Sequence, residues 1–193
     1  TLTHNGGFIC EDMQQCFTGS GVVVFSNARL NPATYYCAGW GPTANGSTND
    51  HGALQAFLTA VPAGARVLFN DAAYALTSSL TIATNLSFGC SNRGSCELTW
   101  TGGASPALII GDNVSNVYLH DLQIRNTGTG TIGIAMRGTN FVGERLRVLW
   151  NGTTGFSVAG IQFLPSAPVS NENLLRDVYV NGMVSAYGIE VGS

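Results

Sequence analysis

The chain of 193 residues contains no lysine, and only 10% of its residues are charged. All 8 basic residues are arginines, and with 11 acidic residues they leave a formal net charge of −3. A protein that binds nucleic acid needs basic residues to neutralise phosphates, so this charge balance argues against such a partner. No apolar run approaches the roughly 18 residues of a membrane span, and nothing resembles a signal peptide. We therefore expect no nucleic-acid partner and no membrane insertion.

Several kinds of catalytic and cofactor site are also missing. No Cys-x-x-Cys pair or Cys/His cluster occurs at the spacing of zinc ligands, and the 3 histidines are too scattered along the chain to form a triad. The glycines of Gly128-Thr-Gly130 follow an expected strand, but no helix is expected after them. A phosphate-binding loop needs the N-terminus of such a helix, so we expect no nucleotide site here. We predict no metal and no cofactor.

The 5 cysteines leave the redox state open. Two pairs lie close in sequence, Cys10 with Cys16 and Cys90 with Cys96, and an extracellular chain could close either pair as a disulfide. The odd count leaves Cys37 over. Buried free thiols are the alternative.

What the sequence does contain is a repeating ladder of apolar residues. Leu108, Ile134, Ile161 and Ile189 follow one another at spacings of 26, 27 and 28, and each has a second apolar residue two positions later. Self-similarity at such a period is typical of a solenoid, in which each repeat buries its apolar face against its neighbours. The alternation of Val, Ile, Leu and Tyr in these repeats indicates short strands rather than helices.

Two further short strands follow the ladder strand in each repeat. Two polar residues separate them: His120-Asp121, Glu144-Arg145 and Arg176-Asp177. Such a pair indicates a tight bend between strands. Three parallel strands per turn define an all-β fold, the single-stranded parallel β-helix, and the crossover rule for parallel strands predicts that it is right-handed.

A short amphipathic helix precedes the repeats. Asp50 stands at the expected N-cap, and Pro62-Ala-Gly64 ends the pattern. Between them apolar residues recur at helical spacing: Leu54, Phe57, Leu58 and Val61. Because the end of a solenoid core is apolar and open, we expect this helix to cap the N-terminal end of the solenoid and to bury its apolar face.

The segment around this helix resembles a known signature. Residues 40–55, with the sequence WGPTANGSTNDHGALQ, are similar without gaps to the F-G-A-x-G-D-G-x-T-D-D-x-x-A-L-Q signature of the pectate-lyase-like single-stranded right-handed β-helix superfamily, which includes many bacteriophage tailspikes. Asn45 and Asn49 stand where that signature has Asp. The resemblance covers roughly residues 35 to 193 and implies the β-helix fold, but this superfamily hosts lyases, hydrolases and non-catalytic adhesins on one scaffold.

We divide the chain into an N-terminal arm and lead-in segment over residues 1–46, the capping helix over residues 47–62, and β-helix coils over residues 63–193. The chain begins with Thr1 and stops as a fourth repeat opens at Ile189, so we expect it to be the N-terminal part of a longer protein. Ile189 and Val191 would then lie on an uncovered apolar end. In a tailspike the N-terminal arm would bind other tail proteins of the virion.

Two carboxylates are candidates for catalysis. Asp121 and Asp177 align at equivalent bends two coils apart, with Arg145 between them. Glycoside hydrolysis needs two carboxyl groups roughly 5 to 10 Å apart, one of which must be protonated. Because an arginine between them would keep both ionised, we expect little or no polysaccharide cleavage by this chain alone. Capping of backbone amides at the bends is the alternative role for both aspartates.

A second candidate site is a sugar-binding face. Gln123, Arg147 and Tyr179 are expected to point outward in one column, and Trp150 ends the strand that contains Arg147. Sugars bind through CH faces laid on aromatic rings and through directed hydrogen bonds, and guanidinium groups pair with anionic sugars. An ordinary solvated sheet face is the alternative.

An apolar strip is predicted on the outward face of the ladder strand, where Ile109, Ala135 and Leu164 follow one another. A contiguous exposed apolar strip usually marks a partner surface. Three β-helices packed side by side, as the resemblance to tailspikes implies, would cover it in a homotrimer. Burial under the long connections between strands is the competing explanation.

Together these observations favour a phage tailspike or tail-fibre-like receptor-binding protein, located in the virion tail or outside the cell. Such a protein recognises a bacterial surface polysaccharide, and we expect the full-length protein to degrade it. A secreted microbial polysaccharide lyase or glycoside hydrolase is the first alternative. A non-catalytic adhesive or structural β-helix is the second.

Overall fold

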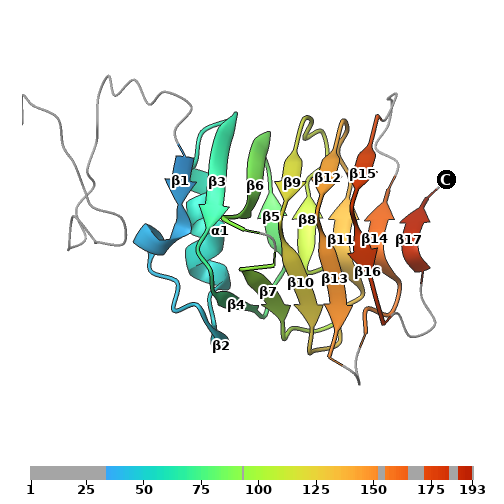
Figure 1. Ribbon diagram of the computed structural model, residues 1–193, viewed down its shortest axis with the longest axis horizontal. Coiled ribbons are helices and arrows are strands. Elements are labelled where there is room, and N and C mark those ends of the chain that lie inside the picture. The colour runs from blue at the N-terminus through green and yellow to red at the C-terminus, as the bar shows by residue number, and fades with distance from the viewer. Residues whose placement is uncertain (1–33, 93, 152–154, 165–171, 183–186, 193) are drawn as a thin grey trace, which may run out of the picture.

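The computed structural model describes residues 34–92, 94–151, 155–164, 172–182 and 187–192. Within these residues the chain coils around one long axis, and its strands stack along that axis from β1 to β17 (Figure 1). The strands form three parallel sheets, which we name A, B and C in the order in which each coil passes through them. The described chain is therefore nearly all-β, as the sequence predicted.

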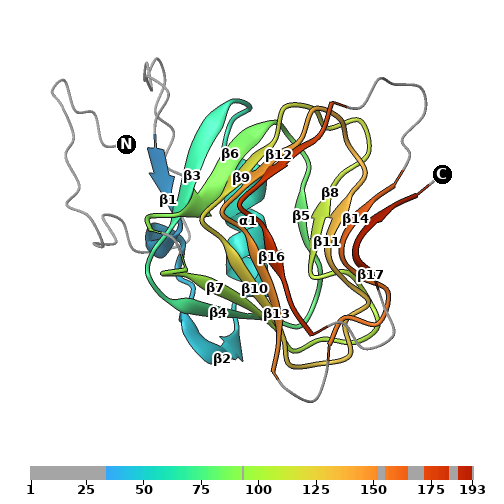
Figure 2. The ribbon, with the colours of Figure 1, turned by 45° about the vertical axis from the view of Figure 1, so that its right-hand side comes forward.

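Each sheet takes one strand from successive coils. Sheet A contains β1 (Thr34–Tyr36), β3 (Ala65–Phe69), β6 (Leu86–Cys90), β9 (Tyr118–His120), β12 (Val142–Glu144) and β15 (Leu174–Arg176). Sheet B contains β2 (Asn45–Asn49), β4 (Ala73–Leu76), β7 (Glu97–Trp100), β10 (Gln123–Asn126), β13 (Arg147–Trp150) and β16 (Tyr179–Val180). Sheet C contains β5 (Leu80–Ile82), β8 (Leu108–Ile110), β11 (Ile132–Met136), β14 (Ala159–Phe163) and β17 (Tyr187–Val191). The three sheets enclose a common interior (Figure 2), and the fold is the expected right-handed parallel β-helix.

The predicted interior ladder is confirmed. Leu108 pairs with Ile134, Ile134 with Ile161, and Ile161 with Ile189, all in parallel register. The ladder also extends back by one coil, because Leu80 pairs with Leu108. The repeat of apolar residues in the sequence therefore corresponds to one coil of the β-helix.

The first coil has a helix where the later coils have a strand of sheet C. β1 pairs with β3 and β2 pairs with β4, and the chain then enters α1 (His51–Ala60), which packs against β5. The side-chain amide of Gln55 donates from Nε2 to the carbonyl of Thr81 at 3.0 Å and accepts the N–H of Thr81 through Oε1 at 2.8 Å. Gln55 thus gives β5 the two hydrogen bonds that a neighbouring strand would give. The segment that the sequence analysis treated as a lead-in therefore contributes strands to the first coil.

The N-terminus of α1 differs from the expectation. Asp50 occupies the N-cap position, but its carboxylate makes no capping hydrogen bond to the helix. The buried carboxylate accepts the backbone N–H of Thr43 at 2.6 Å and that of Ala44 at 3.2 Å. Asp50 therefore holds the loop before β2, which follows η1 (Cys37–Trp40), and the two backbone donors of this loop satisfy the buried carboxylate.

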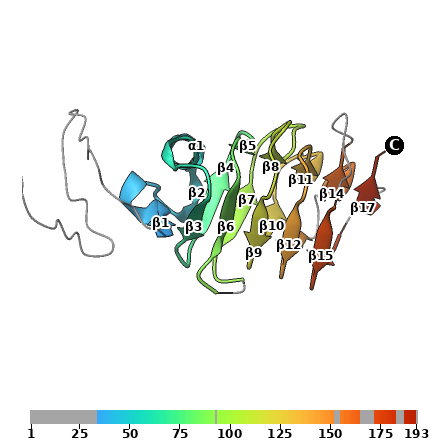
Figure 3. The same cartoon turned by 90° about the horizontal axis from the view of Figure 1, so that it is seen from above.

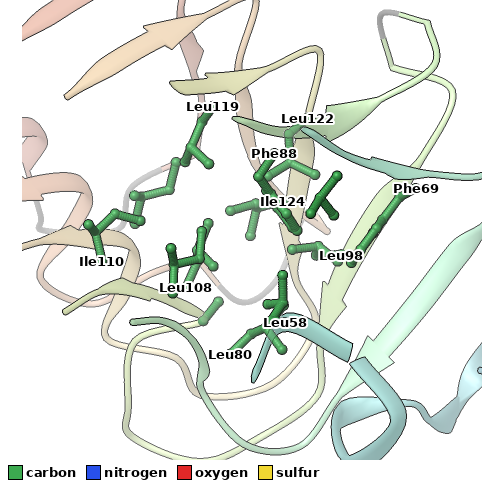
Figure 4. Close-up of a cluster of buried hydrophobic side chains, with 14 of the residues drawn as sticks. Leu58, Phe69, Leu80, Phe88, Leu98, Leu108, Ile110, Leu119, Leu122 and Ile124 are labelled. Atoms are coloured by element: carbon green, nitrogen blue, oxygen red, sulfur yellow. The ribbon is translucent and has the colours of Figure 1, made fainter. Parts of the chain in front are cut away.

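Apolar side chains from all three sheets and from the helix form the core inside the coils. Figure 4 shows Leu58 of α1 near strand side chains such as Leu80 and Leu98. Leu54, Phe57 and Leu58 are buried, so the capping role of the helix is confirmed.

At the opposite end of the described residues, apolar side chains of the last strands are exposed. Ile189 and Val191 of β17 are 47% and 78% exposed. With Phe163 and Leu175 they line an apolar hollow of about 430 Å³. β15, β16 and β17 are the last strands of their sheets, and Figure 3 shows β15 and β17 at one end of the stack. Within the described residues, Ile189 and Val191 thus lie on an uncovered apolar end, as expected.

The prediction of an apolar strip on sheet C is wrong for Leu164. Ala135 pairs with Ile109 on one side and with Gln162 on the other, and Gln162 pairs with Glu190. Leu164 follows the last residue of β14 and belongs to a different column. Two polar residues therefore continue the column, and only Ile109 and Ala135 remain of the apolar strip.

The two predicted disulfides have different outcomes. The structure contains the Cys90–Cys96 disulfide, whereas Cys10 and Cys16 lie outside the described residues. Cys37 is a buried free thiol. In the part of the chain that is described, no helix has the length and apolarity needed to cross a membrane.

Candidate functional site

The outer surface of sheet B carries the predicted sugar-binding residues. Alternate side chains of each strand point away from the core, and parallel register stacks them into columns along the coil axis. One such column contains Glu97, Gln123, Arg147 and Tyr179. The next column contains Thr99, Arg125 and Leu149. Gln123, Arg147 and Tyr179 therefore share one column, and we name the surface formed by both columns the sheet B face.

Glu97 is the centre of a hydrogen-bonded network on the sheet B face. Arg125 Nε donates to both carboxylate oxygens, at 2.9 and 3.0 Å. Thr99 Oγ1 donates to Oε1 at 3.0 Å, and the side-chain amide of Gln123 donates to Oε2. Because the network joins β7 to β10 and pairs the charge of Glu97 with that of Arg125, it forms a fixed polar surface.

Arg147 and Tyr179 lie next to this network, on the two following coils. The guanidinium carbon of Arg147 is 5.9 Å from the centroid of the Tyr179 ring, which is within the range of a cation–π contact. Tyr179 is 48% exposed, so solvent reaches a large part of its side chain. The pair presents guanidinium donors and an aromatic ring in one patch.

Trp150 does not join this patch. It pairs with Asn126, which pairs with Trp100, and both of these residues are completely buried. The alternation of the strand therefore directs Trp150 away from the sheet B face. A Cβ atom placed on Gly182 would overlap the indole of Trp150, so the ring lies against the backbone of the next coil.

A second group of polar side chains lies at the corner between sheets A and B. The corner residues of three successive coils are Asp121, Arg145 and Asp177, and their φ angles are 58°, 52° and 52°. These left-handed conformations form the tight bends that the sequence predicted. The alignment of Asp121 with Asp177 across Arg145 is also present, and a catalytic role for the two aspartates stays a prediction.

Arg145 connects the residues that we name the corner cluster: Tyr118, His120, Asp121, Glu144 and Arg145. Its Nε donates to Asp121 Oδ1 at 2.6 Å, its Nη2 donates to Oδ2 at 2.9 Å, and its Nη1 donates to Glu144. His120 Nδ1 lies 2.9 Å from Asp121 Oδ2. The Tyr118 hydroxyl donates to Glu144 Oε2 at 2.6 Å.

The corner cluster keeps its carboxylates ionised. The hydrogen bond from Arg145 lowers the pKa of Asp121, with a further contribution from His120. The hydrogen bond from Tyr118 and the charge of Arg145 lower the pKa of Glu144. Burial and the bond to Glu144 raise the pKa of Tyr118. At neutral pH neither carboxyl group is therefore the protonated acid that glycoside hydrolysis requires.

Asp177 differs from Asp121 in its surroundings. Asp121 is 8% exposed and accepts from Arg145, whereas Asp177 lies one coil beyond Arg145 and is exposed. Within the part of the chain that the structure describes, no three His, Cys, Asp or Glu side chains gather as metal ligands.

Most of the corner cluster and the whole Glu97 network were not predicted from the sequence. A signal was present in the bends, because coil register stacks His120 with Glu144 and Glu144 with Arg176. At the second bend position, Asp121, Arg145 and Asp177 follow one another on successive coils, so that the sign of the charge alternates there too. Opposite charges stacked on adjacent coils predict ion pairs.

No protein-family model and no curated protein sequence matches the chain. Solved structures match its fold. Geobacillus virus E2 ORF18 matches 67% of this chain at 15% identity with a TM-score of 0.56, and the match spans 28% of the viral protein. The A-module of Azotobacter vinelandii mannuronan C-5 epimerase AlgE4 matches 81% of this chain at 15% identity with a TM-score of 0.54, and the match spans 53% of that structure. At this identity the likeness concerns the fold, which alone does not specify function.

Proposed function

We propose that this chain belongs to a phage tailspike-like receptor-binding protein and that its sheet B face binds a bacterial surface polysaccharide. The observation that carries the proposal is the placement of the half-buried Arg147 and the exposed Tyr179 beside the Glu97 network, on the sheet B face. The fold likeness to a virus protein and to a module named for a polysaccharide epimerase supports the same class. The protein would act in the virion tail, outside the cell.

The physical fit to a sugar follows from three features of this face. The exposed ring of Tyr179 can pack against the CH face of a pyranose. The guanidinium group of Arg147 can donate to hydroxyl or carboxylate oxygens of the same or the next sugar. The network around Glu97 is already ordered, so little side-chain entropy is lost when a glycan lies on it.

The test is binding of the purified chain to an array of bacterial capsular polysaccharides, O-antigen polysaccharides and polymannuronate. We expect binding to at least one polymer, and a roughly tenfold or greater loss of affinity in Arg147→Ala/Tyr179→Ala, because stacking and charge-assisted hydrogen bonds disappear together. The matched control is Arg66→Ala/Tyr187→Ala, which removes an exposed arginine and an exposed tyrosine from sheets A and C.

Two outcomes contradict the proposal. Equal affinity of the Arg147/Tyr179 variant and the wild type for every bound polymer would show that the sheet B face is an ordinary solvated surface. Failure of the wild type to bind any polymer on the array would remove the proposed function itself.

We also propose that the working molecule is a homotrimer, as the resemblance to tailspikes implies. On sheet C, the half-buried Ile109 is the remaining apolar side chain of the predicted contact strip, since Ala135 is fully buried. Sedimentation velocity of the full-length virion protein tests this proposal. A trimer supports it, and a monomer at all accessible concentrations contradicts it.

A further inference from the structure

The two arginines of the sheet B face differ in their partners. Arg125 forms an ion pair with Glu97, because its Nε donates to both carboxylate oxygens at 2.9 and 3.0 Å. In the described part of the chain, no carboxylate forms an ion pair or a hydrogen bond with Arg147. The guanidinium carbon of Arg147 instead lies 5.9 Å from the centroid of the Tyr179 ring. The protein therefore neutralises the charge of Arg125 but not the charge of Arg147.

The sheet B face consequently has an excess of positive charge. Glu97 is balanced by Arg125, which leaves the charge of Arg147 over. The other side chains of the face belong to uncharged residue types: Thr99, Gln123, Leu149 and Tyr179. The whole chain has a formal net charge of −3, so most of its surface repels a polyanion. The sheet B face is a local exception to that repulsion.

Arg147 and Tyr179 are placed so that one ligand can contact both. They pair across neighbouring coils, and neighbouring parallel strands lie about 4.8 Å apart. A sugar unit that packs on the half-exposed Tyr179 ring can therefore direct an acid group toward the guanidinium. Because Arg147 is half-buried, water and salt screen this ion pair less than they would at a fully exposed arginine.

We propose that the sheet B face selects an acidic polysaccharide, in which a sugar unit packs on Tyr179 and its carboxylate pairs with Arg147. This inference rests on the proposed function and adds the substrate class to it. A neutral sugar would contact the same ring but would give Arg147 no negative charge, and hydrogen bonds between charged groups are the stronger ones. Arg125 contributes little to this choice, since Glu97 already accepts its hydrogen bonds.

The first experiment compares each acidic polymer of the array that binds, polymannuronate included, with its carboxyl-reduced form, in which every carboxylate has become a primary alcohol. We expect the wild type to prefer the native form roughly tenfold or more, the worth of a hydrogen bond between charged groups. Arg147→Gln keeps a polar side chain without the charge, so it should lose this preference and bind the reduced form as the wild type does. The matched control is Arg66→Gln, which removes an exposed arginine from sheet A and should keep the full preference.

Three outcomes overturn the inference and leave the proposed function intact. The first is equal affinity of the wild type for the native and reduced forms of every acidic polymer that binds. The second is binding that is confined to neutral polymers. The third is an undiminished preference in Arg147→Gln, which would place the carboxylate at another residue. Failure to bind any polymer is a different result, because it contradicts the proposed function and the inference together.

A second measurement uses single sugars in place of a polymer. ¹H–¹⁵N spectra follow the Nε–H signal of Arg147 during titration with methyl glucuronide, methyl glucoside or acetate. We expect a saturable shift with the glucuronide alone, and we expect Tyr179→Ala to abolish it because the ring holds the sugar. The Nε–H signal of Arg125 is the internal control, since that group is bonded to Glu97. Equal shifts with acetate and glucuronide would show that Arg147 attracts any anion, and this result would overturn the inference.

Discussion

Gln55 and Thr81 exchange two hydrogen bonds in which a side-chain amide takes the place of a β-strand. The carbonyl and the N–H of Thr81 point out of the first edge of sheet C, and Gln55 of α1 satisfies both, at 3.0 and 2.8 Å. An open edge with unpaired backbone groups promotes pairing with other chains. The helix therefore covers the apolar end of the core and closes one strand edge at the same time.

Replacing Gln55 by alanine should destabilise the protein by about 1 to 3 kcal/mol, because the N–H and the carbonyl of Thr81 both lose their partners in a half-buried site. Urea unfolding of the isolated chain measures the change. Thr59→Ala is the control, since Thr59 is exposed and its hydroxyl bonds only within the helix, to the carbonyl of Gln55. A loss below about 0.5 kcal/mol for Gln55→Ala would mean that water replaces the amide at this edge.

Replacing Phe57 by alanine should cost about 3 to 5 kcal/mol, because the ring is completely buried in the core beneath the helix. Phe57→Leu is the matched control and should cost less, since it keeps most of the buried volume. Urea unfolding again measures both. A loss below about 1 kcal/mol for Phe57→Ala would show that α1 is only loosely attached to the β-helix.

The architecture could be predicted from the sequence because each coil repeats the same burial pattern. Leu108, Ile134 and Ile161 occupy equivalent interior positions, and a solenoid offers few other ways to bury apolar residues at this period. The replacement of a strand by α1 was harder to predict. It depends on a side-chain amide that imitates the backbone, and amphipathic periodicity contains no signal for such a contact.

The errors at the candidate site came from neighbours in sequence that occupy different columns. Trp150 follows Leu149 directly, but strand alternation sends the two side chains to opposite faces. Leu164 lies two residues beyond the true column member, Gln162, although the spacing of 27 residues that relates Ile134 to Ile161 also relates Ala135 to Gln162. The ion pair of Asp121 with Arg145 was predictable, since equivalent corner positions stack on adjacent coils. The bond from Tyr118 to Glu144 was not, because it crosses between columns.

Asp121→Asn should destabilise the chain at neutral pH and should matter much less in acid. Its pKa in the folded state lies below its ordinary value of 3.8, mainly because of Arg145. A lowered pKa contributes stability that is fully present above the ordinary value and is lost as the pH falls through the folded value. Urea unfolding of both proteins at about pH 7 and about pH 2.5 measures this. A stability difference that is the same at both pH values contradicts the assignment.

The chain alone should release few or no reducing ends from any polysaccharide that it binds. Asp121 and Glu144 both have lowered pKa values, so the corner cluster provides no general acid near neutral pH. Prolonged incubation with the bound polymer, followed by an assay of reducing ends and of chain length, measures the activity. Turnover that disappears in Asp177→Asn would show that the aligned aspartates are catalytic and would overturn this expectation.

Substitutions of Trp150 and Tyr179 should have opposite effects on the stability of the chain and on its affinity for a glycan. The Trp150 indole lies against Gly182 in an inward column, so Trp150→Ala should cost about 1 to 3 kcal/mol of stability and should leave glycan affinity unchanged. Tyr179 is 48% exposed on the sheet B face, so Tyr179→Ala should cost less than about 0.5 kcal/mol of stability. It should nevertheless weaken glycan binding roughly fivefold or more, the equivalent of about 1 kcal/mol for an aromatic contact. Urea unfolding and array binding of both variants provide the four measurements. Loss of affinity in Trp150→Ala with retained affinity in Tyr179→Ala would place the glycan on a different surface.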